Sequence, residues 1–324
     1  MEFVEIKNDE GLTAKILTLG ATLVSLKFRN KRREEIDCVL GYDSVQAYLD
    51  DKAYMGRTIG PVANRIRNGT FVFKDKEYHL PINCSPHSHH GGPNSTAYQT
   101  WEIVRQSVTS VTLRTTRDEE TDGFPGEARI DVTYTVNDRN QLVLEHYADC
   151  SKEGVLALAH HPYFNLDGSN DVAEHKLYVR ADEYLPTDDD CCPTGGQLSV
   201  KGTRFDLREP RQLSSFRNSD NVIDIDQDLV LRSATRPGEP AVCLFSEKSG
   251  IKLEVATSYP VIHVYGSKFL DTIGKNGEDY SAGKGVAIEA QYHSAALNYS
   301  SFPNIFLVPE KPYRHEVIYS FSQL

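Results

Sequence analysis

The chain has 324 residues, and its 35 lysines and arginines against 46 aspartates and glutamates give a net charge of −11 with histidine neutral. This acidic balance argues against a surface that follows nucleic acid phosphates, so we predict no nucleic acid partner. No run approaches the roughly 18 apolar residues that a membrane-spanning helix needs, so we predict no membrane partner. Residues 1–6 lack the basic and apolar regions of a secretory signal, which favours a cytoplasmic location.

The six cysteines show neither dense spacing nor a C-x-x-C pair. We therefore expect reduced thiols rather than a disulfide framework. A chain of this length should bury about 75% of the surface that its unfolded state exposes, which is enough for a core without disulfide or metal links.

The predicted elements of the first half are short, and most of them alternate apolar and polar residues with the two-residue period of a strand. In the clearest case, Ile130, Val132, Tyr134 and Val136 alternate with polar residues before the turn segment 137–140. In chain order, the pattern predicts strands at 13–18 and 22–28, a short helix at 45–50, and hairpins at 70–82, 101–115 and 128–148.

The second half continues as strands, and no stretch longer than about ten residues has clean helical periodicity with caps. We find neither an interdomain linker nor an internal repeat. The sequence therefore predicts an all-β fold, a large antiparallel β-sandwich of two extended sheets packed face to face, in a single domain over residues 1–324. The further strands are expected at 175–179, 241–245, 251–256, 261–265, 286–289 and 305–308.

Histidines cluster at two places. His87, His89 and His90 share a loop-like segment, and H-x-H spacing on a strand would put two imidazoles on one face as metal ligands, with Cys84 nearby. Proline and glycine flank this cluster, and no carboxylate follows at a ligand-like interval. We therefore favour a solvated polar loop and predict no metal, with a metal site as the alternative.

The second cluster, His160 and His161, follows the apolar run 155–159. Successive strand residues point to opposite faces, so only one of the two can enter a given site, and packing at a strand end would explain both. An imidazole that donates protons near neutral pH needs a partner carboxylate. Glu289 is a candidate because it interrupts an otherwise apolar strand, where an unpaired buried carboxylate is costly.

Two further patterns offer polar groups. Arg65 and Arg67 lie close to a turn, and the guanidinium fork suits a ligand with several oxygens, although a surface salt bridge is the commoner role. Asp224, Asp226 and Asp228 alternate with apolar residues. The glycine and glutamate of a calcium loop are absent there, so we interpret the alternation as a strand.

Together, motifs in a consistent order resemble the galactose mutarotase (aldose 1-epimerase) family over about residues 12–321. The motifs are Val62-Ala63-Asn64-Arg65-Ile66, His90-Gly91-Gly92, the segment from Asp122 to Glu127, His161-x-Tyr163-Phe164-Asn165-Leu166, Phe205-Asp206-Leu207-Arg208, Asp226-x-x-Leu229-Val230-Leu231 and the segment from Gly285 to Gln291.

The resemblance implies a galactose mutarotase-like supersandwich that interconverts the α and β anomers of free aldoses such as galactose and glucose, without cofactor or metal. Ring opening needs a base for the anomeric hydroxyl proton and an acid for the ring oxygen, and the resemblance gives these roles to Glu289 and His161. We expect a monomer or weak homodimer whose partner is a small sugar. The substrate-binding residues that the resemblance implies are His90, Arg65, Asp226, Asn64 and Gln291.

The chain departs from the family pattern at three places. Pro61 follows Gly60 where the family often has arginine, so one cation is missing unless Arg57 replaces it. His263 stands where the family usually has glutamine, and the segment Ser294-Ala295-Ala296 stands where it usually has Pro-Asp-Ala. These departures bear on substrate preference and efficiency more than on the fold.

Three other functions stay open. A sugar-binding module of the same fold would have lost turnover, and the altered segment 294–296 leaves room for that. A hexose-phosphate epimerase would need extra cations for the phosphate dianion. A metal-dependent sugar isomerase would use the cluster of His87, His89 and His90.

Overall fold

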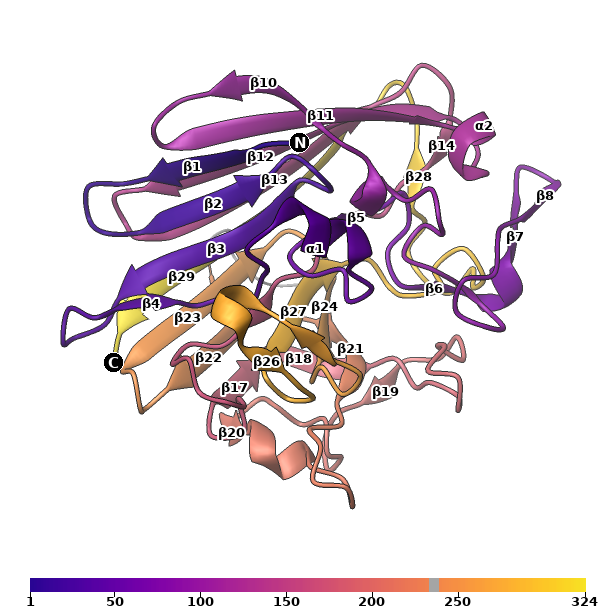
Figure 1. Cartoon of the computed structure of the whole chain (residues 1–324). Helices are drawn as coiled ribbons and strands as arrows, with labels where there is room; N and C mark the ends of the chain where they lie inside the picture. The colour runs from indigo at the N-terminus through magenta and orange to yellow at the C-terminus, as the bar shows by residue number, and fades with distance from the viewer. Residues whose placement is uncertain (233–238) are drawn as a thin grey trace.

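The computed structural model describes residues 1–232 and 239–324, and these residues form mostly antiparallel β-structure (Figure 1). Three sheets dominate this part of the chain, and we name them the large sheet, the site sheet and the N-terminal sheet. The large sheet has the strand order β10 (Glu102–Gln106), β11 (Ser110–Asp118), β12 (Glu127–Asn137), β13 (Gln141–Asp149), β29 (Tyr313–Gln323), β23 (Ile251–Thr257), β22 (Val242–Ser246), β17 (Lys176–Val179) and β20 (Arg211–Gln212).

The two other sheets are smaller. The site sheet has the order β16 (Tyr163–Phe164), β27 (Val286–Gln291), β24 (Val261–Tyr265), β21 (Asp226–Leu231), β18 (Ala181–Tyr184) and β19 (Leu198–Ser199). The N-terminal sheet has the order β1 (Phe3–Lys7), β2 (Thr13–Leu17), β3 (Thr22–Arg29) and β4 (Glu35–Asp37).

Short elements complete the described chain and lie mostly in the connections. The α-helices are α1 (Val45–Asp50) and α2 (Glu119–Asp122), and the 3-10 turns are η1 (Arg67–Gly69), η2 (Thr96–Tyr98), η3 (Leu213–Phe216) and η4 (Lys275–Gly277). The paired short strands are β5 (Thr58–Ile59) with β15 (Ala159–His160), β6 (Arg65–Ile66) with β9 (Ser88–His89), β7 (Thr70–Phe73) with β8 (Lys76–His79), β14 (Gly154–Val155) with β28 (Phe306–Leu307) and β25 (Thr272–Ile273) with β26 (Asp279–Tyr280).

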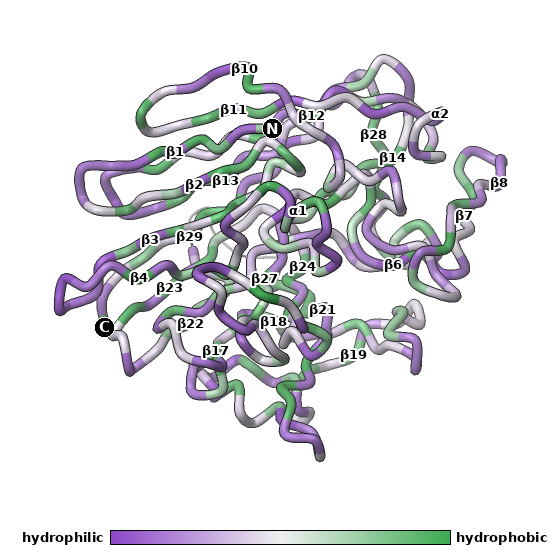
Figure 2. The backbone as a smooth tube through the Cα atoms, viewed as in Figure 1, coloured by the Kyte–Doolittle hydropathy of each residue, from purple (hydrophilic) through white to green (hydrophobic). Residues whose placement is uncertain are grey.

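Residues of all three sheets meet in one apolar core. In β12, Ile130, Val132 and Tyr134 are fully buried and alternate with partly exposed residues, and Ile262 and Ile288 of the site sheet enter the same core. Figure 2 shows hydrophobic stretches along the strands and hydrophilic residues in the peripheral loops. The predicted all-β sandwich is therefore confirmed.

The strands divide into three main sheets rather than the two that we predicted. An isolated bridge between Val39 and Phe164 joins the N-terminal sheet to the edge of the site sheet. The N-terminal sheet and the site sheet are therefore two parts of one layer. They count as separate sheets because a single bridge, rather than a paired strand, joins them.

Most predicted elements form close to their expected bounds. Helix α1 spans Val45–Asp50 as predicted, and its first turn is capped by the Ser44 hydroxyl, which accepts from the Ala47 N–H at 3.2 Å. The hairpin at 128–148 forms as β12 and β13. Strand β27 runs two residues beyond the expected 286–289, because it pairs with the whole length of β24.

The long strand β29 (Tyr313–Gln323) was not predicted. Its start is interrupted by the polar run from Arg314 to Glu316, which hides the alternation of the buried residues Val317, Tyr319 and Phe321. Pairing with β13 on one side and β23 on the other stabilises it in the middle of the large sheet. Such tertiary pairing overrides local sequence preference.

A buried ion pair fixes the connection between β11 and β12. The Arg117 guanidinium donates to both carboxylate oxygens of Asp122, at 2.8 and 2.9 Å, and both side chains are 1% exposed. The same guanidinium donates to the carbonyl oxygens of Phe124 and Pro125. The shape of this connection therefore depends on one charge pair whose donors are well satisfied.

Two expectations from composition can be compared with the structure. All six cysteines lie in the described residues and carry free thiols. Among the described helices, none has the length and apolar character required to cross a bilayer.

Candidate active site

A pocket of about 1040 Å³ opens on the face of the site sheet opposite the core. The side chains on this face alternate with core residues, so Tyr163, Tyr265 and Glu289 point to the pocket while Val264 and Ile288 point to the core. Six of the residues predicted to act on or bind the ligand line it: Asn64, Arg65, His90, His161, Asp226 and Glu289.

A row of ionisable side chains crosses the site sheet at the pocket floor, where His263 and Glu289 line the pocket and Asp228 lies outside its lining. Asp228 of β21 is in register with His263 of β24, which is in register with Glu289 of β27. Residues in register on neighbouring strands face the same way, so the three side chains lie side by side. Asp226 lies two residues before Asp228 and therefore faces the same side.

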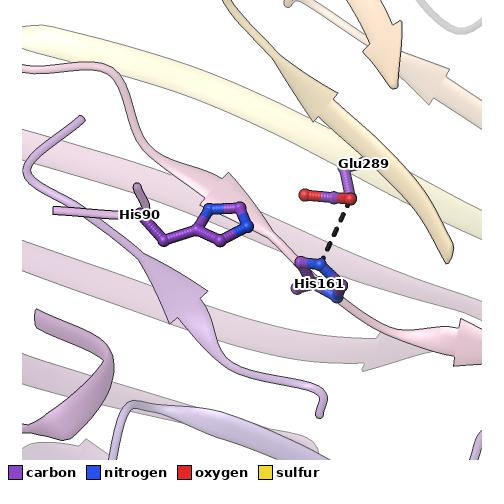
Figure 3. Close-up of side chains that lie close together, drawn as sticks. All are labelled: His90, His161 and Glu289. Atoms are coloured by element: carbon purple, nitrogen blue, oxygen red, sulfur yellow. Dashed lines mark ion pairs between the residues drawn. The ribbon is translucent and has the colours of Figure 1, made fainter. Parts of the chain in front are cut away.

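Glu289 contacts His161 in the pocket (Figure 3). The imidazole Nε2 lies 3.3 Å from the Glu289 Oε1, and both side chains are at most 5% exposed. His160 points the other way, and its two ring nitrogens lie 3.3 and 3.0 Å from the hydroxyl oxygens of Tyr134 and Tyr319. The structure therefore brings one of the two adjacent histidines to the pocket and packs the other in the core.

Burial disfavours the charged form of both members of this pair. It raises the pKa of Glu289 to about 8, although the nearby charge of His263 opposes the shift. It lowers the pKa of His161 to about 3. At neutral pH the pair without a ligand therefore holds one proton, on the carboxyl group, and a proton transfer across the 3.3 Å contact gives a carboxylate beside an imidazolium.

Asn64 and His90 approach each other through unusual backbone geometry. Both have left-handed φ angles, 61° and 51°, which non-glycine residues rarely adopt and which cluster at functional sites. The His90 N–H donates to the Asn64 carbonyl oxygen at 3.0 Å, and the Asn64 N–H donates to the His90 Nδ1 at 3.2 Å. A neutral His90 therefore carries its proton on Nε2, and burial lowers its pKa well below the usual value.

Asp226 lies between two cations. Its carboxylate oxygens are 3.1 Å from the His263 Nε2 and 4.0 Å from the Arg65 Nη2. Burial opposes the negative charge, but the hydrogen bond and charge of His263 outweigh it, so the pKa of Asp226 lies well below its usual range. Asp226 is thus a charged acceptor at the pocket wall throughout the neutral range.

The metal-ligating atoms that lie together at the pocket do not suit a metal ion well. His90, His161 and Glu289 each offer an atom, and these atoms lie within 4.8 Å of one another. The Nδ1 of His90 already accepts from the Asn64 N–H, so its Nε2 bears a proton rather than a free lone pair. This donor set suits hydrogen bonds to oxygen better than a cation.

The three clustered histidines of the sequence do not come together as one ligand set. The His87 Nδ1 accepts from the Asn68 N–H at 3.1 Å, whereas His89 and His90 line the pocket with ring centroids 3.7 Å apart. The prediction of a solvated polar loop is therefore wrong, because His87 and His90 are at most 4% exposed and β9 pairs with β6, which places Ser88 and His89 in a short strand.

The predicted binding residue Gln291, and Arg57 as the possible replacement cation, lie outside the pocket lining. The Gln291 amide donates to the Asp228 carboxylate at 3.2 Å and to the Ser294 hydroxyl at 3.0 Å, so Gln291 lies behind the pocket wall. Arg57 is fully buried, where it donates to the Ala97 and Tyr48 carbonyl oxygens and pairs with Asp51. Arg57 therefore does not replace the missing cation of the family pattern.

Sequence reasoning did not find the aromatic side chains of the pocket. Two of them carry a usable signal. Tyr265 follows His263 by two residues on β24, which places both on one strand face, and Tyr163 at the start of β16 follows His161 by two residues. The others come from loops whose approach depends on the fold. The aromatic lining residues are Tyr42, Tyr54, Tyr98, Tyr163, Tyr265 and Phe269.

The fold and site define a β-sandwich protein whose pocket holds a carboxyl–imidazole pair among hydrogen-bonding and aromatic side chains. Residues 2–320 match the family described as aldose 1-epimerase. Over 99% of its length the chain is 36% identical to the rat galactose mutarotase, of which it covers 94%. Over 98% of its length it is 31% identical to the aldose 1-epimerase of Escherichia coli K12, of which it also covers 94%. The chain belongs to the aldose 1-epimerase family.

Solved structures agree with this assignment. The crystal structure of a GalM/aldose epimerase homologue from C. elegans superposes with a TM-score of 0.97 at 49% identity, covering 100% of this chain and 99% of the other. A galactose 1-epimerase from Lactobacillus acidophilus superposes with a TM-score of 0.83 at 24% identity, covering 99% and 98% of the two chains. The second comparison bears on the fold alone.

Proposed function

We propose that this chain, as a single domain over residues 1–324, is an aldose 1-epimerase that interconverts the anomers of free aldoses such as galactose and glucose. The observation that carries the proposal is the buried contact of 3.3 Å between Glu289 and His161 at the pocket. The anomeric oxygen and the ring oxygen of a pyranose are bonded to the same carbon, so the base and acid that reach them must lie close together. Family membership supports the same activity.

In the proposed reaction, Glu289 as a carboxylate takes the proton of the anomeric hydroxyl while His161 as an imidazolium gives its proton to the ring oxygen. The bond from the anomeric carbon to the ring oxygen breaks, and the anomeric carbon becomes an aldehyde. Rotation about the adjacent carbon–carbon bond presents the other aldehyde face. Closure returns both protons, so the enzyme ends in its starting state. Each such group typically contributes a factor of about 10² to 10⁴ to the rate.

The sugar is held by the polar groups around the pair. The proton on His90 Nε2 suits donation to a sugar oxygen, the Arg65 guanidinium donates to hydroxyl oxygens, and the Asp226 carboxylate accepts from hydroxyl groups. Asn64 adds a side-chain amide at the same wall. Gln291 acts from behind the wall, through Asp228.

The charge of the pocket favours a neutral sugar over a sugar phosphate. Among the described residues that line it, five are aspartate or glutamate, of which Glu289 holds a proton at neutral pH, and the cations are Lys52, Arg65 and His263. Two of these three cations, Arg65 and His263, face Asp226. A phosphate dianion would need more cations than this, so we expect glucose 6-phosphate to compete weakly with glucose.

The test is polarimetry of freshly dissolved α-D-galactose and α-D-glucose at pH 7, with and without protein that has been treated with a chelator. A faster approach to the same final rotation is expected. A protein that binds galactose in calorimetry but leaves the rate unchanged would instead be a sugar-binding module. Acceleration that disappears with the chelator and returns with a metal would favour the metal-dependent alternative.

The pH dependence of the reaction follows from the proton shared by the pair. Burial raises the pKa of Glu289 to about 8, and above that value neither member of the pair carries a proton. The acid is then missing, so we expect kcat/KM to fall as the pH rises through about 8. Polarimetry from pH 5.5 to 9.5, corrected for the spontaneous rate, measures this limb. A rate that keeps rising to pH 9.5 would contradict it.

The cytoplasmic location and the monomeric or weakly dimeric state expected from the sequence stay predictions. Gel filtration coupled to light scattering over a range of protein concentrations would test the second.

A further inference from the structure

His263 lies at the centre of the row of ionisable side chains on the pocket floor. It is 7% exposed, and β24 places it between β21 and β27. Its register partners are Asp228 on one side and Glu289 on the other. The family pattern usually has a neutral glutamine here, so this chain differs from that pattern where three carboxyl side chains converge.

Both nitrogens of His263 face carboxylate oxygens. The Nδ1 lies 2.7 Å from the Asp228 Oδ1, and the Nε2 lies 3.1 Å from the Asp226 Oδ1. An ionised carboxylate has no proton to donate, so each nitrogen must carry one, and the ring is then an imidazolium. The Asn64 amide approaches the same Nδ1 only at 3.4 Å, so the shorter Asp228 contact decides the assignment.

Asp228 ties His263 to the second departure from the family pattern. Its carboxylate accepts from the Gln291 amide at 3.2 Å and from the Ser294 backbone N–H at 2.9 Å. Asp228 is 3% exposed, so its negative charge needs a buried cation nearby. His263, Asp228 and Ser294 therefore form one connected unit, in which the changes at positions 263 and 294 both meet the Asp228 carboxylate.

We propose that His263 is a permanently charged imidazolium that positions the Asp226 carboxylate for the sugar and sets the charge of the pocket floor. The proposal rests on the proposed function, because Asp226 is a sugar ligand only if that function holds. His263 is a positioning residue: both of its N–H groups are occupied by carboxylates, and it acts on the sugar through Asp226.

Several charged groups face His263 from the elements around it, and the two aspartates among them keep it protonated. Burial alone would lower the pKa of His263, but the hydrogen bonds to Asp226 and Asp228 and the charge of Asp228 raise it well above the usual value. Arg65 and three neutral histidines complete the surroundings. The groups are Asp226 and Asp228 on β21, Glu289 on β27, Arg65 on β6, His89 and His90 at the end of β9, and His161 after β15.

The first experiment observes the charge directly. In wild-type protein labelled with ¹⁵N, the imidazole nitrogens of His263, assigned by comparison with His263→Gln, are expected to show two protonated nitrogens from pH 6 to pH 9. A ring with one unprotonated nitrogen, or a midpoint inside this range, would overturn the proposal. This readout does not depend on activity, so it separates the proposal from the proposed function, which polarimetry tests.

The second experiment asks whether the charge matters for the sugar. His263→Gln removes the cation and leaves Asp226 without its charged donor, so we expect KM for galactose to rise about tenfold or more with a smaller change in kcat. The lost positive charge beside Glu289 should also move the alkaline limb of kcat/KM upward by about one pH unit.

The double variant His263→Gln with Asp228→Asn removes one positive and one negative charge. It keeps the pocket floor at its original net charge, so the alkaline limb should return toward the wild-type position, and folding should recover if the single variant is unstable. His79→Gln, an exposed histidine on β8, is the matched control and should change neither KM nor the pH limb. If His263→Gln lowered only stability and kept the wild-type KM and pH profile, His263 would be structural and the proposal would fail.

Discussion

Replacement of Glu289 by glutamine is expected to lower kcat for galactose by about 10² to 10⁴, the range that one acid–base group contributes. Glutamine keeps the shape of the side chain but cannot take the anomeric proton from the sugar. Binding of galactose in calorimetry should change little, because His90, Arg65 and Asp226 remain. Polarimetry measures the rate, and a variant that turned over as fast as the wild type would remove Glu289 from the mechanism.

For the same variant, we expect that stability is kept or increased, although activity is lost. The pKa of Glu289 rises from 4.5 in the unfolded chain to about 8 in the folded protein, because burial disfavours the carboxylate. The folded state therefore holds a proton that the unfolded state releases, and the free energy of unfolding falls as the pH rises between these values. Glutamine has no such penalty, so Glu289→Gln should be at least as stable as the wild type at pH 7.5, as thermal unfolding will show.

The largest loss of stability is expected from Asp122→Ala. This change leaves the Arg117 guanidinium buried without its anion, because both side chains are 1% exposed and joined by two hydrogen bonds. Breaking a buried pair from one side typically costs about 3 to 5 kcal/mol of the free energy of unfolding. Denaturant unfolding measured by circular dichroism gives this value directly.

The matched control is Asp149→Ala, which breaks the pair that Asp149 makes with Arg129 on the surface of the large sheet. These side chains are 35% and 47% exposed, and exposed pairs contribute about 0 to 1 kcal/mol. A similar loss in both variants would show that burial of the Arg117 pair does not set its contribution. A small loss at Asp122 alone would mean that water reaches the guanidinium in the folded state.

Much of the fold could be predicted because it depends on local alternation. The hairpin of β12 and β13 has a clear two-residue period and turn residues between its strands, and the helix Val45–Asp50 has a serine cap. Strand β29 escaped prediction because Arg314 and its polar neighbours break the pattern, and its pairing on both sides is a long-range property. The local sequence of a strand does not indicate which distant strands will pair with it.

The residues of the candidate site also fall into two groups, those that the sequence predicts and those that depend on pairing between distant strands. Residues inside recognisable motifs, such as His161, Glu289 and Asp226, reach the pocket as expected. The buried network of His263 and Asp228 could not be found from the sequence, because it depends on the register of three strands that lie far apart in the chain. Arg57 was considered for the pocket because of its charge, and the fold instead uses that charge to hold buried carbonyl groups.

The register of β21, β24 and β27 also ties the appearance of activity to the end of folding. A slip of one residue in any of these strands would turn its polar side chains toward the core. Partly paired states therefore do not position the side chains of the pocket floor for catalysis. Pairings between distant segments form slowly, because long loops must close before any contact is gained. During refolding, catalysis should therefore return later than most of the β-sheet signal in circular dichroism. The time course of enzyme activity would then report when the last strands pair.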